Sequence, residues 1–146
     1  MATVYDVANA FLLIDNDNDE CDGISNLKLQ KLVYYAQGFY LALFGEALFD
    51  NEIEAWAHGP VTPALYHEYK GFNNNNIEVD VRGDDLDLTQ QEFDLIDEVY
   101  SVFGQFSAWK LRNLTHEETP WIDHEERAEI IPKIELEGYF RTRINN

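Results

Sequence analysis

Four histidines are the side chains of this sequence best suited to proton transfer or metal binding: His58, His67, His116 and His124. None of them falls into the HExxH spacing or into a Cys/His pattern that binds zinc. Acidic pairs directly follow His116 and His124, so a hydrolase that uses His116, Glu117 and His124 is one alternative, although no spacing supports it. We therefore predict a structural or surface role for these histidines, no enzymatic activity, no metal site and no cofactor.

An acidic run, Asp15–Asp19, resembles the start of a calcium-binding EF-hand loop. That loop needs Gly at its sixth position and Glu at its twelfth, where this sequence has Glu20 and Asn26. We interpret the run as a solvated acidic loop. Cys21 lies in the same loop, where the neighbouring carboxylates disfavour a reactive thiolate, so we expect no nucleophile there.

The charge balance is strongly acidic: 28 Asp and Glu face 10 Lys and Arg over 146 residues, for a net charge of −18. Such a surface repels nucleic-acid phosphates and anionic membranes and attracts a basic partner. Solubility alone is the competing explanation of the charge. Because 45% of the residues are apolar, the chain can bury a core and is not a disordered acidic tail.

Compartment signals point to the cytoplasm. A single cysteine excludes an intrachain disulfide, which is typical of a reducing compartment. The N-terminus lacks the pattern of a signal peptide, and the longest apolar stretch, around 39–44, is too short to span a bilayer. We expect a cytoplasmic protein that binds neither nucleic acid nor membrane.

Helix-start signals recur along the chain, with capping-box patterns at Thr3 and Thr89 and apolar stripes behind them. Helices are expected from Thr3 to the acidic loop, from Ser25 or Asn26 to about Phe44, from Thr62 to Gly71, from Thr89 to Gly104, from Ser107 through Leu114, from Thr119 through Trp121, and from Pro132 to Ile144. The second of these is apolar on most sides, which is typical of a central helix.

Two short segments alternate between apolar and polar residues and are expected to be strands. These are Ile53–Trp56 and 77–82, which we expect to pair as an edge hairpin. His58-Gly59-Pro60 is expected to be a turn. The sequence thus predicts a mainly α, compact single-domain bundle over 1–146, with about six helices and a small two-stranded β-hairpin.

Three blocks of sequence, in order, resemble one known family. They are ISNLKLQKLVYYAQG at 24–38, IEAWAHGPV through Leu65-Tyr66, and SAWKL through Leu114-Thr115-His116 to Pro120-Trp121. Together they are similar to the Panacea domain, also called the SocA-like domain. Three ordered blocks are a more specific signal than one short motif.

This resemblance implies an antitoxin that neutralises a cognate toxin by direct binding, without catalytic residues. Alternatives within the resemblance are a proteolytic adaptor that delivers the toxin to a protease, and an inhibitor protein encoded by a phage or prophage. Some members carry an added DNA-binding module, for which this chain has no room. A homodimer is also possible, and the acidity predicts that the bound face of the toxin is basic.

Candidate contact residues are drawn from the second expected helix and from the turn near Trp56. The predicted partner-binding residues are Lys31, Tyr35, Gln37, Trp56, His58 and Tyr66. The competing interpretation is that Trp56, like Trp109 and Trp121, packs in the core. For Lys31 and the nearby Lys28, the competing role is local charge balance with the acidic loop.

Overall fold

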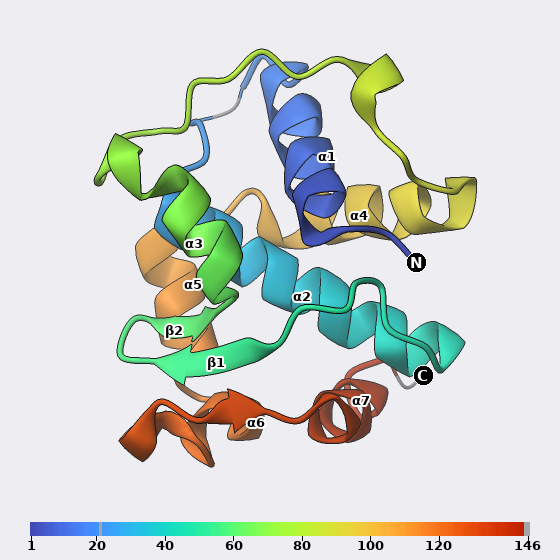
Figure 1. Ribbon diagram of the computed structural model, residues 1–146. Helices are drawn as coiled ribbons and strands as arrows, with labels where there is room; N and C mark the ends of the chain where they lie inside the picture. The colour runs from blue at the N-terminus through green and yellow to red at the C-terminus, as the bar shows by residue number, and fades with distance from the viewer. Residues whose placement is uncertain (21, 145–146) are drawn as a thin grey trace.

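The computed structural model describes residues 1–20 and 22–144 (Figure 1). The interpretation of Cys21 as unreactive lies outside these residues. Within them the helices are α1 (Val4–Asn16), α2 (Asn26–Phe44), α3 (Pro63–Tyr69), α4 (Gln90–Phe103), α5 (Ala108–Thr115), α6 (Thr119–Ile122) and α7 (Lys133–Arg141). Short 3-10 turns lie at Lys70–Phe72, Gly83–Asp85 and Glu125–Arg127. The predicted mainly α class is confirmed, with seven α-helices in the described ranges where about six were expected.

Local capping explains where the main helices begin. The hydroxyl of Thr3 accepts the backbone N–H of Asp6 at the start of α1, and that of Ser25 accepts the N–H of Lys28 at the start of α2. Thr89 opens α4 with the full reciprocal capping box that the sequence predicted. Gly45 ends α2 in the left-handed conformation, φ 72°, which glycine adopts without strain.

Helix α2 is the centre of the fold. It crosses the middle of the molecule, with α1 and α4 on one side and the sheet and α7 on the other (Figure 1). Its large side chains are buried almost all round, including Leu29, Leu32 and Tyr34. Phe11 from α1, Ile96 from α4 and Phe140 from α7 complete the same core. The predicted central position of this helix is therefore confirmed.

The sheet differs from the predicted hairpin. In the described part of the chain it has three strands in the order β2-β1-β3, with β1 at Ile53–Trp56, β2 at Gly59–Val61 and β3 at Ile130–Ile131. Both pairings are antiparallel. The strand prediction for β1 is confirmed. Gly59-Pro60, expected in a turn, instead belongs to β2, and the reversal occurs at Ala57-His58.

The segment 77–82 is not a strand, so its predicted pairing with β1 is wrong. Ile77 donates its N–H to the carbonyl of Ile24 and buries its side chain, while Val79 and Val81 pack half-buried against the core. The alternation therefore reflects a loop that rests one side on the core. The edge of β1 is taken by β3, which lies more than seventy residues further along the chain.

No helix among the described residues is both long and apolar enough to cross a bilayer.

Candidate partner-binding cleft

The structure separates the six predicted contact residues into three groups. Tyr35 and Gln37 are buried in the core, with 1% and 0% of their surface exposed. Trp56 and Tyr66 are half-buried and touch each other, with ring centroids 5.2 Å apart in an edge-to-face arrangement. Lys31 and His58 line a common cleft.

Gln37, one of the predicted contact residues, has no exposed surface. Its side-chain amide donates to the carbonyl of Phe49 and accepts the N–H of Leu48, both at 2.8 Å. These two bonds fix the chain that follows α2 against the helix. A buried polar side chain with both ends occupied is typical of a structural role.

Tyr35 also makes its contacts inside the protein. Its hydroxyl and that of Tyr34 each donate to one carboxylate oxygen of Glu118, at 2.8 Å, and its ring stacks on Phe103 at 4.1 Å. Glu118 is only 8% exposed. Burial raises the pKa of Glu118, against the two tyrosine hydrogen bonds, which lower it. These two hydrogen bonds to the buried Glu118 carboxylate connect α2 to the start of α6.

Two further predicted surface groups prove to be buried. Lys28, expected to balance the acidic loop, donates its ammonium to the carbonyl of Gly104 at 2.7 Å. Asp15, assigned to the solvated loop, accepts the hydroxyl of Tyr100 at 2.6 Å. Residues 16–20 are exposed, as expected of that loop.

The cleft has a volume of about 330 Å³, within the range of small ligand sites. It lies where the first turns of α2 and α5 meet the β1–β2 reversal and the loop after α3. Its lining consists of Ser25, Leu27, Lys31, His58, Asn73, Asn74, Ala108, Trp109 and Arg112. Of the predicted contact residues it contains only Lys31 and His58.

Lys31 is the least expected member of this lining. It is 1% exposed, and its ammonium donates to the carbonyl of Leu27 at 3.3 Å. Burial, together with the nearby charge of Arg112, lowers the pKa of Lys31 to about 8. Gly59, at φ 126°, makes room for it, because a Cβ there would lie 3.2 Å from Lys31 Cε and 3.0 Å from Thr115 Oγ1.

Trp109 and Arg112 form the exposed wall of the cleft. The indole of Trp109 is 67% exposed, so its alternative assignment to the core is wrong, and the Arg112 guanidinium lies 4.8 Å from its ring centroid. The helical spacing contains the signal that could have found this. Leu111 and Thr115 are the buried positions of α5, and a residue two before Leu111 points to the opposite face.

His116 lies beside the same cations. Its ring stacks on Trp121 at 3.8 Å, and within the described residues its Nε2 is buried without a hydrogen-bond partner. Burial lowers the pKa of His116, and the charges of Arg112 and Lys31 lower it further. Trp121 in turn donates its indole N–H to the carbonyl of Trp56 at 2.7 Å, so the prediction of a structural role suits this histidine.

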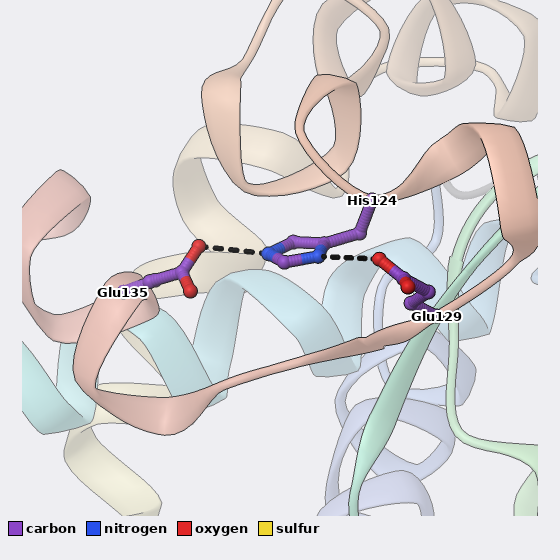
Figure 2. A network of polar contacts seen from close by, with 3 residues as sticks. All are labelled: His124, Glu129 and Glu135. Atoms are coloured by element: carbon purple, nitrogen blue, oxygen red, sulfur yellow. Dashed lines mark hydrogen bonds and ion pairs between the residues drawn. The ribbon is translucent and has the colours of Figure 1, made fainter.

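His124 forms a separate clip at the base of the molecule. Figure 2 shows its ring between two carboxylates, with Nε2 2.8 Å from Glu135 and Nδ1 3.3 Å from Glu129. The hydrogen bond to Glu135 is the main cause that raises the pKa of His124. The clip joins the turn before β3 to α7. Across residues 1–20 and 22–144, no group of three or more His, Cys, Asp or Glu is placed to hold a metal ion.

The residues of the hydrolase alternative do not assemble at the cleft. His116, Glu117 and His124 are all absent from its lining. Glu117 is exposed, and both ring nitrogens of His124 are engaged by carboxylates.

Comparison with known proteins gives two matches. The family model described as "Antitoxin SocA-like, Panacea domain" matches residues 29–122, a span that includes Lys31, His58 and the α5 wall of the cleft. The antitoxin SocA of Caulobacter vibrioides (strain NA1000 / CB15N) is 46% identical over 59 residues. That alignment covers 40% of this chain and 31% of the Caulobacter protein. No solved structure matches this chain significantly.

Proposed function

Because this chain belongs to the SocA-like Panacea family of antitoxins, we propose that it neutralises a cognate toxin by binding it directly. The proposal rests on the family match over 29–122, which covers most of the central helix, β1 and β2, and the helix that bears Trp109. Antitoxins of the direct-binding kind need a contact surface and no reaction centre. We accordingly propose that the chain acts without catalysis.

The contact surface is the face around the cleft. Trp109 and Arg112 belong to the residue types that dominate binding energy in protein interfaces. Trp109 is a large, exposed, rigid anchor, and the His58 side chain is exposed at the neighbouring reversal. A toxin side chain could enter the cleft between them while its neighbours pack on the indole.

The acidic surface has a supporting role. A net charge of −18 accelerates encounter with a toxin whose outer surface is basic, and this steering weakens as salt rises. We propose such a toxin as the partner, with electrostatic attraction acting at long range and the cleft face supplying the specific contacts.

The test is co-expression of this protein with the product of the adjacent gene, after showing that this product alone arrests growth. Wild-type protein should restore growth. Trp109→Ala should weaken protection and reduce affinity about tenfold or more, whereas Ile134→Ala, which truncates an even more exposed apolar residue on α7, should change neither. A product that stays toxic beside the wild-type protein would refute the proposal. A fall in the toxin's half-life on co-expression would replace direct blocking by delivery to a protease.

A further inference from the structure

The cleft carries the charge opposite to that of the molecule. The chain has 28 acidic and 10 basic residues, yet the cleft is lined by Lys31, Arg112 and His58, and no Asp or Glu is found in its lining among the residues described. In so acidic a protein, a concave site that holds two cations and excludes carboxylates is not expected from composition.

Lys31 is a buried charge for which residues 1–20 and 22–144 supply no ion pair. Two exposed or partly exposed basic side chains of this protein pair with carboxylates: Lys133 lies 3.3 Å from Glu52, and Arg141 forms an ion pair with Glu137. In the part of the chain that the structure describes, Lys31 has no such ion pair and donates only to a carbonyl at 3.3 Å. A buried ammonium in this state is costly unless a ligand supplies the opposite charge.

Two helix starts add partial positive charge to the same cleft. Ser25 and Leu27 belong to the N-cap and first turn of α2, and Ala108 and Trp109 to the first turn of α5. Neither first turn contains an acidic residue. The first turns of α1 and α4 do contain one, so this chain uses acids elsewhere to balance the helix dipole.

The remaining lining suits a ligand that is anionic at one end and apolar at the other. Asn73 and Asn74 contribute side-chain amides, which can donate to an oxygen without adding charge. Leu27, Ala108 and the indole of Trp109 supply an apolar wall beside the cations.

We propose that this cleft binds an oxyanion, a carboxylate or phosphate group, between Lys31 and Arg112, with the carbon skeleton of the ligand resting on Trp109. This inference goes beyond the antitoxin function. It concerns the chemical group that the cleft binds, and it does not depend on which partner carries that group.

Binding of an anion also sets the direction of a proton exchange. Burial and Arg112 hold the pKa of Lys31 at about 8 in the free protein. A bound anion stabilises the ammonium and raises that pKa, so near pH 8 the complex takes up protons. The measured binding enthalpy should therefore change with the ionisation enthalpy of the buffer, and affinity should fall as the pH rises above 8 or as salt is added.

The experiment is calorimetric titration of the full chain with inorganic pyrophosphate and, separately, with glutarate, in Tris and in HEPES at pH 8. Wild-type protein should bind at least one probe with proton uptake. Lys31→Met should weaken that binding about tenfold or more, as expected for loss of a charge-assisted hydrogen bond. Lys110→Met is the matched control, because this substitution removes the same charge. Lys110 is exposed on the same helix as Arg112 and lies outside the cleft lining.

Each outcome decides the question. Binding of pyrophosphate alone assigns a phosphate, and binding of glutarate assigns a carboxylate. If neither probe binds, or if Lys110→Met weakens binding as much as Lys31→Met, the proposal is wrong. Circular dichroism verifies that the variants fold. If Lys31→Met does not fold, Arg112→Gln provides the same test of anion binding. The toxin plays no part in this experiment, so its result is independent of the proposed function.

Discussion

Lys31 and Glu118 are both buried ionisable groups, and the structure treats them in opposite ways. Glu118 accepts hydroxyls from Tyr34 and Tyr35, one on each carboxylate oxygen. Within the described residues, the ammonium of Lys31 forms one hydrogen bond, of 3.3 Å to a carbonyl, and the side chain lines a cleft. A buried charge whose bonds are satisfied within the fold contributes to structure, whereas one that is left without a counter-charge beside an opening is available to a ligand.

The largest expected effect follows from removal of the satisfied charge. Glu118→Ala leaves two buried tyrosine hydroxyls without an acceptor and should lower the free energy of unfolding by about 3–5 kcal/mol. Glu117→Ala, at the exposed neighbouring position, should change it by less than about 0.5 kcal/mol. Urea denaturation measures both. If both variants lose little unfolding free energy, and by equal amounts, the hydrogen bonds from Tyr34 and Tyr35 to Glu118 do not stabilise the fold.

Gln37 extends the comparison to a neutral buried group. Gln37→Leu removes the partners of the Leu48 N–H and the Phe49 carbonyl and should cost about 2–4 kcal/mol of unfolding free energy. Gln105→Leu, at an exposed position, is the control. A Gln37 variant that loses toxin binding while keeping wild-type stability would restore Gln37 as a contact residue.

Lys31→Met should affect stability differently from Glu118→Ala and Gln37→Leu. Because the pKa of Lys31 is about 8 when folded and 10.5 in the unfolded reference, the unfolded state binds more protons between these values. Wild-type stability should therefore gain roughly 1–3 kcal/mol from this group as pH rises from about 8 to 10.5, while below pH 8 the charged form weakens the fold.

Urea unfolding at several pH values measures this effect. Lys31→Met should lack the gain, and at pH 7 it should be about as stable as wild type, within about 1 kcal/mol, or more stable. Lys110→Met, which removes the same charge from an exposed position, is the matched control. A large loss of stability in Lys31→Met at pH 7 would show that Lys31, like Glu118, is a charge that stabilises the fold.

The smallest effect is expected at the partly exposed clip of His124. Its pKa is raised by Glu135 and Glu129, so the stability that it adds is full below the unfolded pKa near 6.5 and is lost as pH rises through the folded value. His124→Gln should cost no more than about 1 kcal/mol at pH 5.5 and less at pH 8.5. Thermal unfolding at the two pH values measures this cost. A loss that grows with pH would contradict this role.

Local signals in the sequence were sufficient for most of the helical framework. Thr3, Ser25 and Thr89 act as caps within their own first turns, so their effect requires no knowledge of the rest of the fold. The pairing of β1 with Ile130–Ile131 is non-local, and no pattern near Ile53 indicates it. The alternation at 77–82 resembled a strand because a loop packed on a core can show the same period.

The site was predicted less well, for a related reason. A polar residue on a helix that is apolar on most sides can point to solvent, to a buried bond or to a cleft. Gln37 and Lys31 illustrate the last two outcomes. The choice depends on segments distant in sequence, such as Phe49 for Gln37 and Gly59 for Lys31. Trp109 was also missed, although here the spacing of α5 alone places it opposite Leu111.

The most direct test of the contrast between the two charges is the pKa of Lys31 itself, followed by the NMR signals of its ε-methylene group across pH 6–11. We expect a pKa of about 8 in the free protein and a rise on saturation with pyrophosphate or glutarate. A pKa near 10.5 in the free protein, or a value that stays the same when the anion binds, would contradict an open, uncompensated charge in the cleft.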